Sequence, residues 1–274
     1  MELSDSVVDH LRRVAALPDL SGTRYEIERE IGRGGLGVVY AAFDRDLQRR
    51  VALKVTEAAL AGEAQLIAKL EHPAIVPIYE TGALPDGRSF YAMKLVAGAP
   101  LDRWIVSAPS LAERLRVIRR AGEAVAFAHA RGVIHRDLKP QNVMAGEFGE
   151  VYVMDWGVEA VGGTPAFRAP ETRLDQRSDV YGLGALLESV LPADAPPALR
   201  AIAARAMEAD PAARYAGAAE FLADIQRFED GQAVEAWAEP MWHRLQRFGS
   251  RNAVLLWLLA AYAAAKFVLF FLRR

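Results

Sequence analysis

The chain of 274 residues contains no cysteine and few histidines. The absence of cysteine excludes disulfides, cysteine-ligated zinc, iron–sulfur clusters and a thiol nucleophile. The five histidines form no H-E-x-x-H pair, which excludes a zincin-like site. A net charge of −2 gives no indication of a nucleic-acid partner. The first twenty residues also lack the apolar run of a secretory signal.

The chain does contain enough apolar material for a folded core. It is 52% hydrophobic and 25% charged, and its length fits one large domain or two small ones. The mean hydropathy of +0.06 is slightly high for a soluble protein. One cause is local, because residues 253–272 hold 19 apolar residues in 20, interrupted only by Lys266. As a helix this segment would span about 30 Å, the thickness of a bilayer core, so the sequence predicts a transmembrane helix.

The charge is divided unevenly along the chain. Residues 241–274 contain six Lys/Arg and no Asp/Glu, whereas the preceding 240 residues contain 27 Lys/Arg and 35 Asp/Glu. An acidic domain is therefore joined to a basic tail. Residues 230–252 are expected to form a basic amphipathic segment at the membrane surface; the alternative is an ordinary amphipathic helix that packs on the folded domain. The residues expected on its apolar face are Trp237, Met241, Leu245 and Phe248.

The hydrophobic pattern divides the rest of the chain into three regions. Residues 1–24 predict an N-terminal helical extension docked on the main domain, because apolar residues recur there at helical spacing. Residues 25–97 alternate as strands, with one inserted helix. Residues 98–229 are mainly helical, and Ser110 with Glu113 predicts a capping box at the start of a long helix.

Two clusters in the strand-rich region point to phosphate binding. The first is the glycine-rich run 32–37, Gly-Arg-Gly-Gly-Leu-Gly, with strands on both sides. This context argues against a Rossmann turn, which leads from a strand into a helix, and suits a β-hairpin lid whose N–H groups approach phosphates closely. The second is Lys54 on the strand-like run Val-Ala-Leu-Lys, with Glu63 on the following helix as its candidate anionic partner.

A third cluster supplies the remaining groups that phosphoryl transfer needs. The run His-Arg-Asp-Leu-Lys-Pro-Gln-Asn over residues 135–142 is followed by Asp-Trp-Gly from Asp155. Phosphoryl transfer needs a carboxylate that orients the acceptor, oxygen ligands for Mg²⁺ and positive charge at the γ-phosphate. Asp137, Asn142, Asp155 and Lys139 carry those groups.

Taken in order with the runs HPAIVPIYE, GTPAFRAPE, SDVYGLG and DPAARYAGAAEF, these clusters resemble a eukaryotic-like bacterial serine/threonine protein kinase. The resemblance covers about residues 25–229. It implies an α+β, two-lobed protein-kinase-like fold, with a small β-rich N-lobe over 25–97 and a mainly helical C-lobe over 98–229. ATP and Mg²⁺, with Mn²⁺ possible in its place, are the implied cofactors.

The resemblance also implies a role for each matching residue. Lys54 would hold the α- and β-phosphates and pair with Glu63, while Asp137 would accept or orient the proton of the substrate hydroxyl. Lys139 would face the γ-phosphate, and Asn142 and Asp155 would bind magnesium. The nucleotide site would comprise the lid residues Ile31, Gly32, Gly34 and Gly37, the adenine contacts Val39, Ala52 and Met144, the gatekeeper Met93, and the hinge backbone at Lys94 and Val96. The structural residues would be Glu171 paired with Arg214, Asp179 as an anchor of the catalytic loop, and a stack of Ile67, Ile78, His135 and Trp156.

Several segments of the chain are shorter than the corresponding segments in the family pattern. Only eight residues separate Lys54 from Glu63, and no Ser, Thr or Tyr lies between Trp156 and Thr164. Arg136, which normally meets a phosphate on that loop, would face Glu159 instead, so we expect catalysis without loop phosphorylation. The stretch after the Asp179-containing helix is too short for the extra helix that the family usually has there.

The sequence therefore predicts a kinase that transfers the ATP γ-phosphate to protein serine or threonine hydroxyls at the cytoplasmic face of the inner membrane. The single span over 253–272 would lie in the lipid bilayer and leave the kinase domain in the cytoplasm, where ATP is available. Three arginines before the span and two after it agree with this orientation. The alternatives are a membrane-tethered pseudokinase that acts as a scaffold, and a small-molecule phosphotransferase on the same fold. The oligomeric state is left open.

Overall fold

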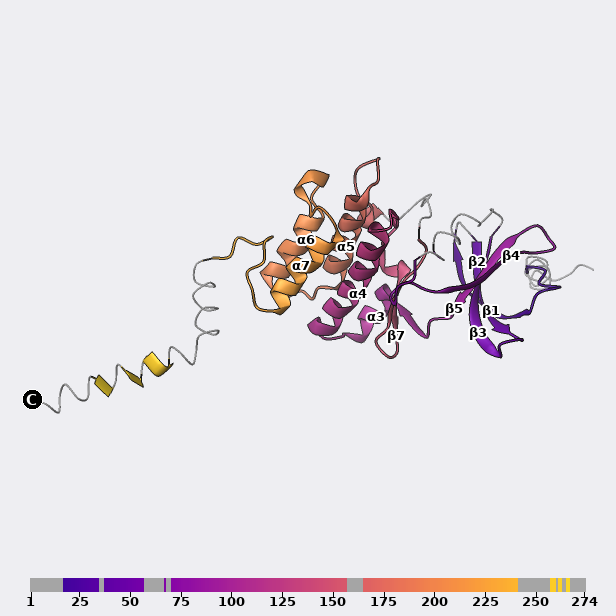
Figure 1. The fold of residues 1–274 in the computed structure, drawn as a ribbon, viewed down its shortest axis with the longest axis horizontal. Helices are drawn as coiled ribbons and strands as arrows, with labels where there is room; N and C mark the ends of the chain where they lie inside the picture. Colours follow the sequence, from indigo (N-terminus) through magenta and orange to yellow (C-terminus); the bar gives the residue numbers. More distant parts are fainter. Residues whose placement is uncertain are drawn as a thin grey trace, which may run out of the picture.

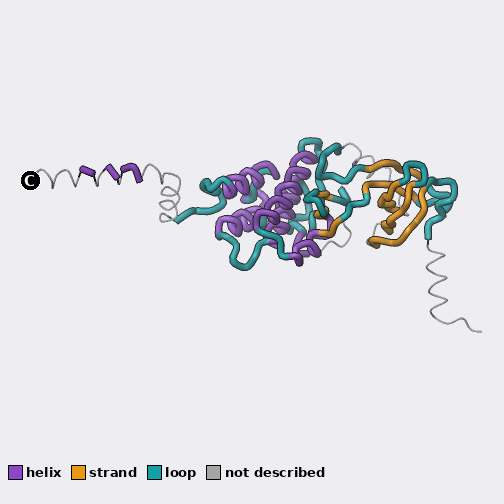
Figure 2. Tube along the Cα trace, turned by 90° about the horizontal axis from the view of Figure 1, so that it is seen from below, coloured by secondary structure: helices purple, strands orange, loops and turns teal. Residues whose placement is uncertain are grey.

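The computed structural model describes residues 17–34, 37–56, 67, 70–156, 165–240, 257–259, 261–262 and 265–266. Strands gather at one end of the folded body and helices at the other (Figures 1 and 2). The segment that joins them follows the last strand of the larger sheet, near residues 95–97. The predicted two-lobed α+β architecture is therefore confirmed.

The N-lobe is a five-stranded antiparallel sheet in the order β1-β2-β3-β5-β4. Its strands are β1 (Tyr25–Gly34), β2 (Gly37–Asp44), β3 (Arg49–Thr56), β4 (Ile78–Ala83) and β5 (Ser89–Lys94). Central strand β3 is buried from Val51 to Thr56, which explains its unbroken apolar run. Before β1, Leu20 packs on the apolar core of the sheet, and Arg88 donates to the Leu17 carbonyl at 3.0 Å.

The described part of the C-lobe combines a small three-stranded sheet with five α-helices. Its strands are β6 (Gly98–Pro100), β7 (Val143–Gly146) and β8 (Val151–Val153). Its helices are α3 (Leu101–Trp104), α4 (Leu111–His129), α5 (Gln176–Val190), α6 (Pro197–Ala206) and α7 (Ala218–Glu229), with 3₁₀ turns at Ile105–Ser107, Pro140–Asn142, Pro165–Phe167 and Pro211–Ala213. The predicted capping box is present, because the Ser110 hydroxyl accepts from the Glu113 N–H while Glu113 accepts from the Ser110 N–H.

Helix α5 lies at the centre of the C-lobe. Ten of its residues are buried, and a Cβ added at Gly184 would come within 2.6 Å of the Ala206 Cβ on α6. Residues 191–196 lead directly from α5 to α6, with no helix between them. Arg200 holds this connection by donating to the carbonyls of Pro192 and Ala193 at 3.0 and 2.9 Å.

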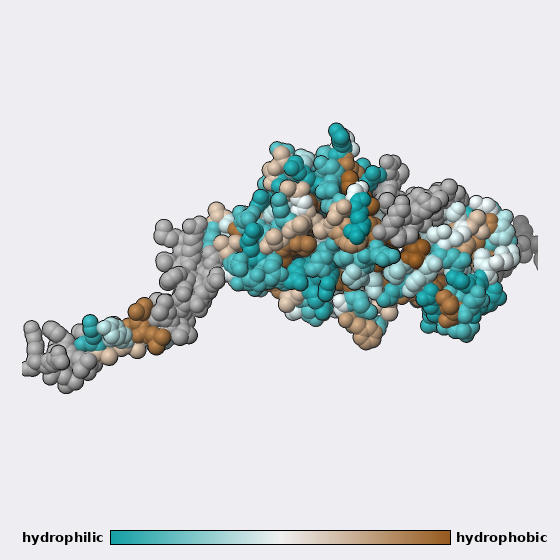
Figure 3. All heavy atoms as spheres, viewed as in Figure 1, coloured by the Kyte–Doolittle hydropathy of each residue, from teal (hydrophilic) through white to brown (hydrophobic). Residues whose placement is uncertain are grey.

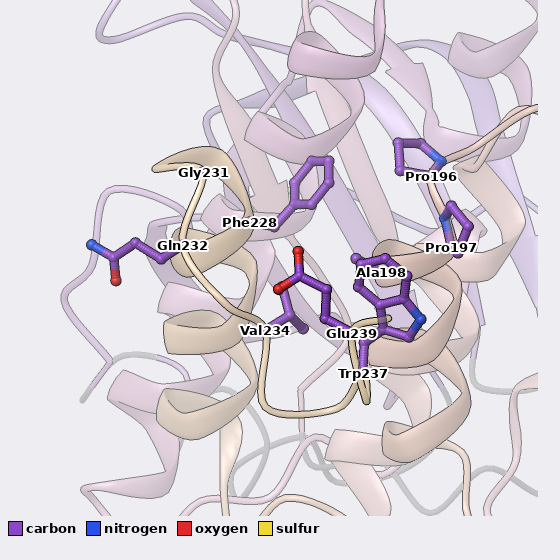
Figure 4. A pocket seen from close by; sticks show the side chains of 9 residues that line it. All are labelled: Pro196, Pro197, Ala198, Phe228, Gly231, Gln232, Val234, Trp237 and Glu239. Atoms are coloured by element: carbon purple, nitrogen blue, oxygen red, sulfur yellow. The ribbon is translucent and has the colours of Figure 1, made fainter. Parts of the chain in front are cut away.

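The segment after α7 folds back onto the C-lobe. Asp224, which has no exposed surface, accepts hydrogen bonds from the N–H groups of Glu235 and Ala236 at 2.7 and 3.0 Å. Trp237 packs against the lobe's core and lines a pocket of about 230 Å³ with Phe228 and other residues (Figure 4). Residues 231–240 contain no helix, so the prediction that Trp237 lies on a helical face directed at the membrane is wrong. Its stated partners Met241, Leu245 and Phe248 lie outside the described residues.

Two further expectations concern the ends of the chain. The predicted N-terminal helix falls on residues outside the described part. Among the described residues, no helix has both the length and the apolar character needed to cross a membrane. Of residues 253–272, those described are helical and exposed, and they include Trp257, Leu258, Leu259 and Tyr262 (Figure 3).

Candidate active site

An ion pair joins the two lobes at the predicted site. Strand β3 places the Lys54 ammonium, which is almost fully buried, 3.1 Å from Oδ1 of Asp155. The two residues are 101 positions apart in the sequence. The Asp155 side chain is 41% exposed, so its carboxylate can still reach a ligand from the cleft.

The catalytic-loop residues form one compact cluster. Lys139 Nζ lies 2.6 Å from Oδ2 of Asp137. The 3₁₀ turn Pro140–Asn142 places Asn142 so that its Nδ2 donates to the carbonyl and to Oδ2 of Asp137, at 2.8 and 3.1 Å. Because the amide nitrogen is used in this way, the Asn142 Oδ1 oxygen remains as an acceptor. The structure thus brings together three of the residues that the sequence assigned to transfer and metal binding.

One buried carboxylate binds the backbone of this loop. Asp179 on α5 is 1% exposed and accepts from the N–H groups of His135 and Arg136, at 2.7 and 2.8 Å. His129 Nε2 lies 2.8 Å from the same carboxylate. Arg136 has φ of +71° and Asp155 has φ of +55°, in the left-handed region that side chains rarely adopt. The hydrogen bonds to Asp179 hold the strained backbone at Arg136 in place.

His135 is part of the scaffold. Its ring lies 4.7 Å from the Trp156 ring, and both side chains are fully buried. Nε2 lies 2.8 Å from the Met154 carbonyl, and Nδ1 accepts from the Asp137 N–H at 3.3 Å. Burial lowers the pKa of His135, so the neutral ring with a proton on Nε2 satisfies both bonds. Ile67 belongs to the same apolar core cluster as Trp156, and Ile78 packs against that cluster. Of the predicted stack, the contact between His135 and Trp156 is confirmed.

The predicted adenine contacts also lie together. Ala52 and Met93 are buried in one apolar cluster. The other predicted contacts Val39, Val96 and Met144 are among the partly buried residues that pack against it. At the hinge, the Lys94 N–H donates to the Pro77 carbonyl at 3.2 Å and its ammonium contacts the Tyr152 hydroxyl, which raises the pKa of Lys94. The Val96 N–H has no hydrogen-bond partner in the described part of the chain.

The glycine lid shows which of its glycines the backbone requires. Gly37 has φ of +133°, and a Cβ there would lie 2.2 Å from the Val55 carbonyl oxygen. A Cβ at Gly34 would meet nothing within 4 Å, and one at Gly32 would meet only Val39. The backbone therefore requires a glycine at Gly37, whereas a side chain at Gly34 would meet no atom of the protein within 4 Å. Ile31, which precedes Gly32 on β1, is exposed.

The predicted pair between Glu171 and Arg214 is confirmed. Arg214 Nη1 and Nη2 donate to the two carboxylate oxygens at 2.9 and 2.8 Å, and the Ser178 hydroxyl adds a bond of 2.7 Å. Partial burial raises the pKa of Glu171, but these hydrogen bonds outweigh it and lower the pKa to about 2. The carboxylate is therefore ionised and bound at neutral pH.

Several predicted residues lie outside the described part: Glu63, Glu159 and Thr164. The ion pair between Lys54 and Glu63 therefore stays a prediction. The same holds for the predicted contact between Arg136 and Glu159. Sequence reasoning missed the contact of Tyr152 with Lys94 and that of His129 with Asp179, because no spacing rule connects residues on different elements. A histidine on the buried face of a long helix was the only available signal for the second contact.

A comparison with protein-family models shows to which family the chain belongs. The model for the protein kinase domain matches residues 25–210. The chain belongs to the protein kinase domain family. The predicted relationship to eukaryotic-like bacterial serine/threonine kinases is confirmed by the relatives that this kinase domain matches.

Two curated relatives and one solved structure illustrate the likeness. The serine/threonine-protein kinase PknB of Mycolicibacterium smegmatis is 34% identical, over 80% of this chain and 45% of its own length. The DNA damage-responsive serine/threonine-protein kinase RqkA of Deinococcus radiodurans is 37% identical, over 61% of this chain and 29% of its own. The crystal structure of the M. tuberculosis PknI kinase domain has a TM-score of 0.61 at 25% identity, covering 76% of this chain and 96% of that one. The chain thus spans less than half the length of the curated relatives it matches.

Proposed function

We propose that this chain is an ATP-dependent protein kinase that transfers the γ-phosphate to serine or threonine hydroxyls. The observation that carries the proposal is the Lys54–Asp155 pair, 3.1 Å long, which brings the phosphate-binding lysine of one lobe against the other. The cluster of Asp137, Lys139 and Asn142 belongs to the same site through the short loop that Asp179 holds.

The residues present fit both implied cofactors. The apolar cluster around Ala52 and Met93 suits a planar base, and the Val96 N–H is a donor for its edge. Mg²⁺ typically takes one or two protein oxygens and completes its shell with phosphate and water. The Asn142 Oδ1 and the Asp155 carboxylate are such oxygens, and Mn²⁺ accepts the same ligands. The bound ion would neutralise charge on the phosphates.

The chain's own groups position the acceptor. The Asp137 carboxylate accepts the proton of the incoming hydroxyl, and Asn142 fixes its rotamer through Oδ2. Lys139, 2.6 Å away, places positive charge beside the reacting oxygens. The buried Lys54 ammonium has little freedom and is already oriented for phosphate oxygens.

Two finer features belong to the same proposal. The lack of Ser, Thr and Tyr between Trp156 and Thr164 supports activity without loop phosphorylation. The apolar run over 253–272 and its basic flanks support a single anchor in the cytoplasmic membrane, with the kinase domain in the cytoplasm.

The activity is tested with γ-labelled ATP and a mixed protein substrate, followed by phosphoamino-acid analysis. Label on phosphoserine or phosphothreonine is expected. If ATP binds and no label is transferred, the chain acts as a pseudokinase; if label reaches small acceptors and no protein, it is a small-molecule phosphotransferase. Either result refutes the proposal.

The proposed independence from activation-loop phosphorylation is tested in a separate experiment. Protein treated with phosphatase, and shown by mass spectrometry to carry no phosphate, is expected to transfer at the untreated initial rate. A lag that ends as phosphate accumulates on the protein would show that prior phosphorylation is required.

A further inference from the structure

One hydrogen bond joins the two lobes next to the apolar cluster around Ala52 and Met93. Lys94 is the last residue of β5, and its ammonium donates to the hydroxyl of Tyr152 in the middle of β8. The two residues are 58 positions apart in the sequence. In the described part of the chain, this is the only hydrogen bond that either group makes. The bond is thus a contact between the lobes in addition to the Lys54–Asp155 pair.

Tyr152 itself is part of the apolar cluster that suits the adenine base. It is 8% exposed and belongs to the same cluster as Ala52 and Met93. Met144 lies opposite Tyr152 in the register of β7 and β8, and it packs against the cluster. A tyrosine combines an apolar ring with a polar tip. At this position the ring lies in the cluster and the hydroxyl oxygen accepts from Lys94.

Lys94 connects this cluster to the sheet of the N-lobe. Met93, the residue before it, lies opposite Ala52 on β3. After Lys94 the chain passes into the C-lobe through residues 95–97, which form neither helix nor strand. A few residues of irregular backbone can absorb a change in the angle between two domains. Since the bond to Tyr152 spans this connection, it restrains the separation of β5 and β8.

The bond is charge-assisted, and its loss leaves the fold intact. Hydrogen bonding to the Tyr152 hydroxyl raises the pKa of Lys94, so the ammonium stays charged at neutral pH. Lys94 is partly exposed, so water can hydrate its ammonium when the hydroxyl is removed. Removal of the hydroxyl is therefore expected to loosen the connection between the lobes without unfolding either of them.

We propose that Lys94 and Tyr152 are positioning residues for the nucleotide, whose bond keeps the two sides of the adenine site at the spacing that a planar base requires. The inference rests on the proposed function and adds two side chains to it. Ala52 lies on the N-lobe sheet and Met144 on the C-lobe sheet, so the contacts with the base come from both lobes. A wider gap between β5 and β8 weakens those contacts, because dispersion attraction falls steeply with distance.

Tyr152→Phe is the principal test, because it removes only the hydroxyl. The KM for ATP and the Kd for adenosine should both rise about three- to tenfold, while kcat stays within about twofold of wild type. Lys94→Met should raise both constants by a similar factor, and Lys94→Arg, which keeps a charged donor, should restore them. The double variant Lys94→Met with Tyr152→Phe should show no larger increase than either single variant, because both remove the same bond.

Tyr25→Phe is the matched control. It removes another buried hydroxyl of the N-lobe, which donates to Glu80 at 2.5 Å and lies in a different apolar cluster. It should lower the melting temperature and keep the wild-type KM and Kd.

Three results would overturn the inference and leave the proposed activity standing: a lower kcat at unchanged KM in Tyr152→Phe, an equal rise of KM in Tyr25→Phe, or additive effects in the double variant. A wild-type protein that binds neither ATP nor adenosine would overturn the proposed function and this inference with it.

Discussion

At the scale of single residues, buried polar groups hold the catalytic loop in shape. Asp179 satisfies two backbone N–H groups and one imidazole with a single carboxylate. His135 links the loop to the segment that carries Asp155, through its bond to the Met154 carbonyl. Each of these side chains is buried, so the loss of one hydrogen bond leaves its partner unpaired and out of contact with water. Such an unpaired group lowers the stability of the folded protein.

Asp179→Asn should reveal this cost. The Asp179 carboxylate accepts from three donor groups. The NH₂ of an asparagine would face one of those donors, and we expect the free energy of unfolding to fall by about 2–4 kcal/mol. Urea denaturation measures it. Asp194→Asn is the control, since Asp194 is exposed; equal stability of the two variants would contradict the role given to Asp179.

Glu171→Gln tests the pair with Arg214 through its pH dependence. The pKa of Glu171 is about 2 in the folded protein, against an ordinary value of 4.5. Its stabilising effect is therefore complete above about pH 4.5 and is lost as the pH falls toward 2. The variant should melt roughly 6–12 °C lower than wild type at pH 7, and the gap should narrow steadily below pH 4.5. A gap that is constant down to pH 3 would show that the carboxylate's charge is not involved.

Residue-level prediction succeeded where the chemistry is local. Asp137, Lys139 and Asn142 lie within one short loop, so their order in the sequence almost determines their grouping. That Lys54 and Asp155 belong to one site followed only from the family resemblance, because the sequence places them 101 residues apart, and the direct contact between them was not predicted. Trp237 was misplaced for a physical reason: the buried Asp224 captures the neighbouring N–H groups and turns the chain back onto the lobe.

At the scale of elements, α5 is the platform for the whole C-lobe. Two of its glycines allow close approach, Gly182 to the catalytic loop and Gly184 to α6. Its first turn carries Asp179, whose carboxylate accepts from the catalytic-loop N–H groups of His135 and Arg136. The position of this one helix therefore determines the position of the catalytic loop. The connection to α6 over 191–196 contains no helix, and Arg200 holds it through hydrogen bonds to two of its carbonyls.

Gly182→Ala tests the contact between α5 and the loop. The new methyl group would clash with Leu138, and either α5 or the loop must move. We expect a loss of about 1–3 kcal/mol in stability, despite the better helix propensity of alanine, together with a reduced kcat. Gly217→Ala is the control, because a Cβ there meets nothing within 4 Å and its φ is −166°. Equal effects of the two substitutions would contradict the packing argument.

At the scale of the whole molecule, the protein joins three unlike parts. The strand-rich lobe and the helical lobe meet through the Lys54–Asp155 pair, and the segment 231–240 lies against the far end of the helical lobe (Figure 1). The composition of the tail could be read from the sequence. The course of residues 231–240, in contrast, depends on tertiary contacts with α7 that no local pattern records.

Deletion of residues 253–272 tests the membrane part of the proposal. The full chain is expected in the membrane fraction after carbonate washing, and the deletion variant in the supernatant with its peptide-kinase activity retained. A matched variant with Leu258→Asp and Leu259→Asp should also leave the membrane, because a charge at the centre of a span costs roughly 2.5–3.5 kcal/mol. A full-length protein that washes off would refute the anchor.

The central claim is that residues from both lobes form one phosphoryl-transfer site. Its most direct test is to measure ATP affinity and the rate of γ-phosphate transfer together, in wild type, Asp137→Asn and Lys54→Met. We predict that Asp137→Asn binds ATP with near wild-type affinity and transfers phosphate at least about 100-fold more slowly. Lys54→Met should also lose transfer, with weaker ATP binding. Wild-type transfer rates in Asp137→Asn would contradict the account.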